Sequence, residues 1–268
     1  MQSSRLFRLC RHVFAFIFAV VSIISPARAT SFTTDQSDIW SALGEDGWAI
    51  QFIQRGSAIF ATIYVYDPAT NSIWYTATLE SAGGFTWAGD LYISQGPWFG
   101  TIPFSSGAVH LRKVGTMTWT ASTVTTGTLT YSVDGVVVAK SLQRYLIRYD
   151  DISGSYYGGF VYTLSGCTNP ANNGPTTEFS AIQVSQNGLN VTIHESIATG
   201  GSCNYLGTYS QAGQMGALNG TFTCSNGAIG TFQAFEMQVT ISGISGRFVG
   251  KNQFCNTSGR FGGVRSTQ

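Results

Sequence analysis

One short pattern recurs along the chain and constrains its fold class: a glycine, a small polar or basic residue and a large apolar residue open a stretch of alternating polarity. The pattern occurs at Gly127-Thr128-Leu129, Gly207-Thr208-Tyr209, Gly220-Thr221-Phe222, Gly230-Thr231-Phe232, Gly246-Arg247-Phe248 and Gly259-Arg260-Phe261. Alternation with a period of two places one row of side chains in a core and the other in solvent, as in a half-buried β-strand. Because glycine gives the backbone extra freedom, we expect these glycines at turns or bulges. The pattern predicts an all-β protein.

The strand pattern divides the chain into two halves of similar size. The segment from Arg148 to Gly154 interrupts the alternation. We therefore expect an aromatic-rich β-domain over residues 30–148 and a disulfide-bearing β-domain over residues 149–268, each near the common domain size. Short connections predict antiparallel meanders of about eight strands, each a barrel or a sandwich. Two alternatives are a single larger sandwich and an outer-membrane barrel, in which hydroxyl groups of Thr118 to Ser122 and Thr128 to Ser132 would line a lumen.

The first 29 residues have the composition of an export signal. Three arginines within the first eleven residues precede an apolar run from Val13 to Ile24, and Pro26-Ala27-Arg28-Ala29 ends in the small-x-small pattern of signal peptidase sites. We expect cleavage after Ala29 and a periplasmic or extracellular location. Cleavage removes four arginines and no acidic residue, so the formal net charge falls from +1 to −3. A mildly acidic chain without a basic run argues against nucleic acid as a partner, and the processed chain is not expected to be an integral membrane protein.

Four cysteines follow the expected leader: Cys167, Cys203, Cys224 and Cys255. An even set in an exported protein predicts two disulfides. Sequential neighbours in a meander tend to be spatial neighbours, which favours Cys167 with Cys203 and Cys224 with Cys255 among the three connectivities. The spacings are too wide for the Cys-x-x-Cys pairs of a zinc site, so no metal is predicted.

The sequence carries no catalytic or cofactor motif. It has no Gly-x-Ser-x-Gly elbow, phosphate-binding loop or zinc-protease helix, so we predict no catalytic residue and no cofactor. His194 and Glu195 are neighbours on an expected strand, so they point to opposite faces and cannot act directly as a pair. Carboxylates for glycoside hydrolysis would have to come from separate strands, for example Asp90 with Glu80 or Glu178 with Glu236. A hydrolase is therefore an alternative without a signature of its own.

The best candidate for a binding surface is the first expected hairpin, formed by Ile59 to Tyr66 and Ile73 to Glu80. One of its faces is aliphatic, and the other combines hydroxyl groups with the rings of Phe60, Tyr64, Tyr66 and Trp74. Rings beside hydroxyl groups suit sugars, which are apolar on their faces and hydroxylated at their edges. The alternative is that this face packs under a second sheet or fills a barrel, because aromatic side chains are common in cores.

A second candidate is the segment Gly96-Pro97-Trp98-Phe99-Gly100, in which Trp98 and Phe99 lie between residues that break regular structure. It would form an exposed binding tip or plug the end of a barrel. Together these six side chains predict a binding protein for a glycan or another small hydroxylated ligand. A structural or protein-interaction module of the cell envelope is the alternative.

Part of the first half resembles a β-module of exported proteobacterial proteins. The resemblance is carried by Gly47-Trp48-Ala49-Ile50-Gln51-Phe52-Ile53-Gln54-Arg55-Gly56, Ile59-Phe60-Ala61-Thr62, Tyr66-Asp67 and Trp74-Tyr75. The segments Gly96 to Gly100, Pro103-Phe104 and Gly127 to Arg144 look like further parts of the module. The resemblance implies a secreted β-module found in varied contexts and brings no catalytic residues.

Overall fold

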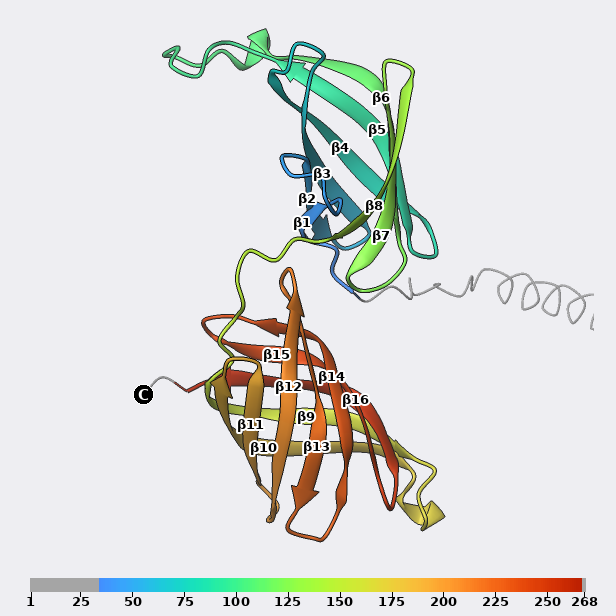
Figure 1. Cartoon of the computed structure of the whole chain (residues 1–268), viewed down its shortest axis with the longest axis vertical. Coiled ribbons are helices and arrows are strands. Elements are labelled where there is room, and N and C mark those ends of the chain that lie inside the picture. The colour runs from blue at the N-terminus through green and yellow to red at the C-terminus, as the bar shows by residue number, and fades with distance from the viewer. Residues whose placement is uncertain (1–33, 267–268) are drawn as a thin grey trace, which may run out of the picture. The chain divides into compact units, whose positions relative to one another are not determined.

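A computed structural model describes residues 34–266, which form two closed antiparallel barrels of eight strands each (Figure 1). The first barrel contains β1 (Asp38–Ser41), β2 (Ala49–Arg55), β3 (Ala58–Tyr66), β4 (Ser72–Gly83), β5 (Thr86–Gln95), β6 (His110–Ala121), β7 (Thr126–Val133) and β8 (Val136–Arg144). The second contains β9 (Gly154–Ser165), β10 (Gly174–Asn187), β11 (Asn190–Ile197), β12 (Ser202–Ala212), β13 (Met215–Cys224), β14 (Ile229–Val239), β15 (Gly243–Asn252) and β16 (Asn256–Arg265). Each strand pairs with the next along the chain, and the rings close through β1 with β8 and β9 with β16.

The fold class predicted from the alternation is confirmed: the protein is all-β, and both eight-stranded meanders are barrels rather than sandwiches. Closure pairs the first and last strands of each meander, so no sheet edge is left unpaired. The expected leader, residues 1–29, lies outside the described residues. Within residues 34–266 there is no helix of the length and apolar character needed to cross a bilayer.

The interior of the first barrel is filled by apolar side chains. The rings of Trp40, Phe52 and Trp119 pack against one another with centroids 4.7 to 6.1 Å apart. Fully buried aliphatic side chains complete this core, among them Ile50, Ile59, Ile63, Leu79, Leu91, Met117 and Leu129. An eight-stranded barrel is just wide enough for side chains to fill, and here they do.

The hydroxyl-bearing strand faces of the first barrel point outward. Met117, Trp119 and Leu129 are buried, so the alternating threonines beside them on β6 and β7 lie on the outer surface. Thr118 pairs with Thr130 across the two strands. These hydroxyl groups therefore do not line a lumen.

The glycines of the recurring pattern lie inside strands rather than at turns or bulges, which corrects the sequence-based expectation. None of the six has a positive φ. An added Cβ at Gly220 would lie 1.9 Å from the backbone oxygen of Leu206, and one at Gly246 would lie 2.7 Å from the ring of Phe261. Glycine is therefore needed here because a neighbouring strand or ring approaches closely in a strongly curved barrel.

The four cysteines form two disulfides as predicted, but the predicted connectivity is wrong. The bonds join Cys167 to Cys255 and Cys203 to Cys224. Cys203 and Cys224 are directly opposite each other in the register of β12 and β13. Barrel closure places β16 beside β9, which brings the segment after β9 next to the segment before β16. The disulfide pairing is thus set by which strands are adjacent in the closed barrel, and not only by which strands follow each other in sequence.

Candidate functional site

The six aromatic side chains predicted as ligand contacts all lie outside the first barrel. On β3 and β4 the exposed fractions are 46% for Phe60, 46% for Tyr64, 60% for Tyr66 and 53% for Trp74. Tyr64 faces Trp74 directly across the two strands. The loop residues Trp98 and Phe99 are also exposed, with ring centroids 5.2 Å apart. The alternative in which these rings fill a barrel is therefore wrong, because the aliphatic face of the same strands occupies the interior.

One end of the second barrel is filled by apolar side chains. There a buried apolar cluster packs together: Ile152, Val191, Tyr209, Leu218, Ala234 and Met237. The Tyr156 hydroxyl donates a hydrogen bond of 2.8 Å to the carbonyl oxygen of Ile152 at this end. The connecting segment that precedes β9 thus closes this end of the barrel.

Beyond this cluster, aromatic side chains that are only partly buried line the interior: Phe160, Tyr162, Tyr205, Phe222, Phe232, Phe248 and Phe261. Of these, Phe232, Phe248 and Phe261 also pack against the cluster. Tyr205 contacts Phe222 and Phe232 with ring centroids 5.6 and 5.3 Å apart. Each of these rings keeps part of its accessible surface, so this half of the interior is lined by rings and remains partly open to solvent.

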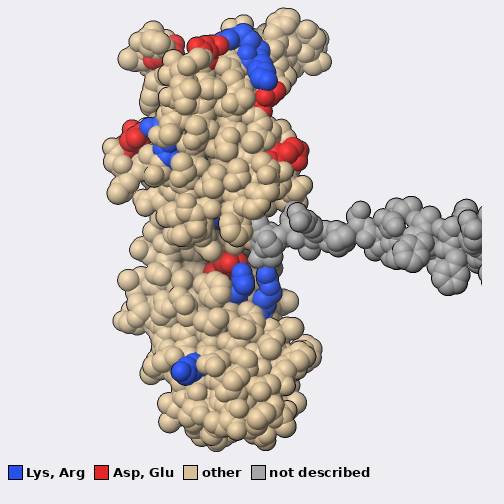
Figure 2. Space-filling view, turned by 90° about the vertical axis from the view of Figure 1, so that its right-hand side faces the viewer, with Lys and Arg blue, Asp and Glu red and all other residues tan. Residues whose placement is uncertain are grey.

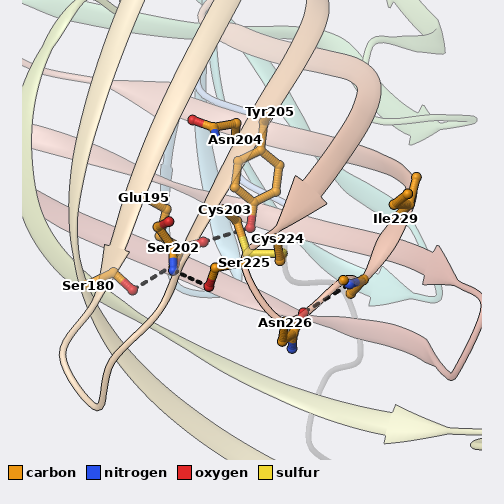
Figure 3. Close-up of a disulfide and its surroundings, with 12 residues drawn as sticks. Ser180, Glu195, Ser202, Cys203, Asn204, Tyr205, Cys224, Ser225, Asn226 and Ile229 are labelled. Carbon is orange, nitrogen blue, oxygen red and sulfur yellow. Dashed lines mark hydrogen bonds between the residues drawn. A yellow bond between two sulfur atoms is a disulfide. The ribbon is translucent and has the colours of Figure 1, made fainter.

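A buried carboxylate lies on the wall of this aromatic-lined half. Glu195 projects inward from β11 and is only 2% exposed. Ser180 on β10 donates a hydrogen bond of 2.6 Å to its Oε1, and the Tyr205 hydroxyl on β12 donates one of 2.7 Å to its Oε2. Figure 3 shows these two donors approaching Glu195 from the strands on either side.

A second carboxyl group completes the cluster. Glu178 lies two residues before Ser180 on β10 and therefore on the same inward face. Tyr162 donates a 3.5 Å hydrogen bond to Glu178 Oε2, and the Glu178 carboxyl lies close enough to Glu195 for the charge of Glu195 to act on it. Burial, and then the charge of Glu195, raise the pKa of Glu178 to about 7. One of the two carboxyl groups is thus protonated below neutral pH.

The phenol groups around the pair act as hydrogen-bond donors. Burial, followed by the charge of Glu178, raises the pKa of Tyr162 to about 12. Burial, followed by the charge of Glu195, raises the pKa of Tyr205 as well. Both phenols therefore stay protonated across the physiological pH range and donate to the carboxylates.

Within residues 34–266, no Lys, Arg or His side chain forms an ion pair with Glu178 or Glu195. The two carboxylate pairings considered from the sequence are not formed, because Asp90 is paired with Lys113 and Glu236 with Arg247. A buried charge without a counter-ion is costly. Such groups are concentrated at functional sites, which makes this cluster the candidate site of the protein.

The Cys203–Cys224 disulfide fixes the strands that carry the site. Cys203 is opposite Glu195 in the register of β11 and β12, and it lies two residues before Tyr205 on the same face. Figure 3 shows the disulfide beside Glu195 and Tyr205. Ser202 N–H also donates to Ser225 Oγ at 3.0 Å across β12 and the turn after β13. The bond therefore holds β13 against the strand that supplies the Tyr205 hydroxyl.

Sequence reasoning missed Glu195, although a signal for it exists. The inward positions of β11 are Val191, Ile193, Glu195 and Ile197, so a carboxylate interrupts an otherwise apolar row. The prediction that His194 and Glu195 point to opposite faces is confirmed. His194 is exposed, and its Nδ1 lies 2.8 Å from Asn204 Oδ1 on the outer surface. No group of three or more metal-ligating side chains clusters within residues 34–266.

Comparison with known proteins adds no relative: no family model matches the chain, and neither curated proteins nor solved structures give a match.

Proposed function

We propose that this is a binding protein whose second barrel takes a small amphipathic ligand into its aromatic-lined half. The observation that carries the proposal is Glu195, a carboxylate that is 2% exposed, has no basic partner within residues 34–266 and lies beside aromatic rings that keep part of their accessible surface. An apolar interior with a few convergent polar groups is the usual form of a small-molecule site. The rings would hold the body of the ligand, and Glu195 would accept hydrogen bonds from its polar group.

The spacing of the two carboxyl groups favours binding over glycoside hydrolysis. Hydrolysis needs carboxyl groups about 5 to 9 Å apart, so that the sugar and a water or a nucleophile fit between them. Glu178 is instead close enough to Glu195 for the charge of Glu195 to raise its pKa. Two carboxyl groups that share a proton suit the binding of a polar group better than the insertion of a scissile bond.

The proposal is tested with three compounds that share one apolar body: 2-phenylethylamine, 2-phenylethanol and phenylacetate. We expect at least one of the two donor-bearing compounds to raise the melting temperature, since a ligand at 100 times its Kd stabilises the native state by about 2.7 kcal/mol. Glu195→Gln should weaken this binding at least about tenfold, because hydrogen bonds to a charged group contribute about 1.5 to 3 kcal/mol.

Each variant is compared with its own ligand-free melting temperature, so a change in intrinsic stability does not enter the result. Glu80→Gln, on the outer surface of the first barrel, is the matched control and should bind as the parent protein does. Binding of none of the compounds, or equal binding by Glu195→Gln, would refute the proposed site.

The outer aromatic face of the first barrel supports a second candidate function, glycan binding. The specific observation is that Phe60, Tyr64 and Trp74 are about half exposed on adjoining strands. Thr62 and Thr76, which pair with each other, lie on the same outer face between these rings. On the side of the molecule drawn in Figure 2, charged side chains are few and are separated by wide uncharged areas, in keeping with the 10% of charged residues in the chain.

A glycan array tests this second function. Tyr64→Ala and Trp74→Ala should each lower glycan binding about tenfold or more, because a ring that stacks on a sugar supplies most of the contact at its subsite. Phe179→Ala removes an exposed ring, with 67% of its surface accessible, from the second barrel and should leave glycan binding unchanged. An array without any bound glycan would contradict this function and favour a protein-interaction surface instead.

A further inference from the structure

We infer that the ligand of the second barrel carries an organic ammonium group, which binds between the aromatic rings and the carboxyl groups of Glu178 and Glu195. The inference rests on the proposed function and names the ligand class for that site.

The polar groups of the site are matched to a cation. The hydroxyl groups of Ser180, Tyr205 and Tyr162 all donate to the two carboxylates, so their protons are already used. What remains for a ligand is the acceptor capacity of the carboxylate oxygens. An ammonium group offers three donors and a positive charge, whereas a ligand carboxylate would be repelled.

The walls of the site favour the same class of ligand. Tyr205, whose hydroxyl donates to Glu195, contacts the rings of Phe222 and Phe232. A cation close to the face of an aromatic ring gains about 0.5 to 2 kcal/mol, with the larger value where water is excluded. The same rings accommodate an apolar body attached to the ammonium group.

Among residues 34–266, no other charged group faces the pair. The titratable groups around Glu178 are Tyr162 on β9, Glu195 on β11 and Tyr205 on β12. The inward residues of β13 to β16 at this level are the uncharged Phe222, Phe232, Phe248 and Phe261. Arg265 lies four residues beyond Phe261 on β16, where it donates to the Ser153 carbonyl and its guanidinium lies over the Tyr156 ring.

The proton balance follows from the two carboxyl groups. Without ligand, Glu178 is mostly protonated below its pKa of about 7, because burial and the neighbouring Glu195 disfavour a second negative charge. An ammonium group beside the pair favours the ionised form, so it lowers this pKa and the proton leaves to solvent as the ligand binds. The complex then holds one ligand cation where the free protein held one proton.

Linkage gives the sign of the pH effect. Below about pH 7 the ligand must displace a proton, so affinity should fall by up to about tenfold for each pH unit of acidification. Above about pH 8 Glu178 is already ionised, and affinity should no longer change with pH. The site would thus take up its ligand at neutral to mildly alkaline pH and release it in acid.

Titration calorimetry with 2-phenylethylamine measures the exchange directly. In two buffers of different ionisation enthalpy at pH 6, binding should release close to one proton per ligand, and at pH 8 close to none. 2-Phenylethanol should bind at least tenfold more weakly than the amine at pH 8, and phenylacetate more weakly still.

Glu178→Gln is the decisive variant, because it keeps the charge of Glu195 and removes the exchangeable proton. Its affinity for the amine should be constant between pH 6 and pH 8, with no proton release, whereas the Glu80→Gln control should behave as the parent protein.

A second measurement, of thermal stability, needs no ligand. The folded parent holds a proton on Glu178 that the unfolded chain releases above about pH 4.5, so its melting temperature should fall between pH 5 and pH 8. Glu178→Gln should lose this slope.

The outcomes separate the two proposals. Binding of the alcohol as tight as that of the amine, or amine binding without proton release at pH 6, would overturn the inference and leave the proposed site standing. Failure of all three compounds to bind would overturn both. A pH-dependent affinity that persists in Glu178→Gln would assign the proton to another group and would also overturn the inference.

Discussion

Replacing Trp119 with alanine is expected to lower the free energy of unfolding by about 3 to 5 kcal/mol, the range for a large buried aromatic residue. Its side chain is fully buried and packs against Trp40 and Phe52. Its indole N–H also donates a 3.1 Å hydrogen bond to Gln36 Oε1, and Gln36 is itself fully buried. The substitution therefore leaves both a cavity and a buried amide oxygen that has lost this donor.

Trp74→Ala is the matched control for this prediction. Its side chain is 53% exposed on the outer face of the same barrel, so its loss should change the free energy of unfolding by less than about 1 kcal/mol. Urea unfolding followed by far-ultraviolet circular dichroism measures both variants without relying on tryptophan fluorescence. Equal losses in the two variants would contradict the assignment of inner and outer faces in the first barrel.

Removal of the Cys167–Cys255 disulfide is expected to have an effect of similar size. The bond joins residues 88 positions apart, and loop closure of this length corresponds to about 4 to 5 kcal/mol of lost unfolded-state entropy. The Cys203–Cys224 bond spans 21 positions, for which the same relation gives about 3 kcal/mol. The Cys167–Cys255 disulfide, which closes the longer loop, should therefore stabilise the protein more.

Two double variants test this order: Cys167→Ser with Cys255→Ser, and Cys203→Ser with Cys224→Ser. Their urea unfolding midpoints should both fall, with the larger fall in the first. The reverse order would contradict the loop-length argument, and a Cys167–Cys203 link in non-reducing peptide maps would contradict the closed-barrel arrangement itself.

Local patterns were enough to predict the fold class and most strands. For example, Asp134-Gly135, a pair typical of tight hairpins, joins β7 to β8, and both residues have the positive φ that such a turn requires. Strands β1 and β5 have weak sequence patterns for physical reasons. β1 has only four residues, and in β5 Gly89 interrupts the apolar row of Trp87 and Leu91.

The disulfide pairing and the candidate site could not be predicted, because both depend on closure of the barrels. The disulfide pairing needs β16 beside β9, a contact between the two ends of a meander that no local pattern encodes. The same holds for the candidate site, because Tyr162, Glu178, Glu195 and Tyr205 come from four strands whose inward faces converge only in the barrel. Glu178 was considered from the sequence with Glu236 as its partner, but Glu195 takes that place.

Alternation also could not decide which face of the β3–β4 hairpin turns inward. It separates the aliphatic row of Ile59 and Ile63 from the aromatic row of Phe60 and Tyr64, and either could face a core. The interior of an eight-stranded barrel is narrow, and here Trp40, Phe52 and Trp119 already occupy much of it. The smaller aliphatic side chains fit around them, and the rings remain outside.

The most direct test of the central claim, that the second barrel holds a ligand against Glu195, is a crystal structure of the protein with 2-phenylethylamine at pH 8. The account predicts the phenyl group beside Phe222 and Phe232 and the nitrogen within hydrogen-bonding distance of a Glu195 carboxylate oxygen. An interior without the amine, or an amine bound only on the outer surface, would contradict it.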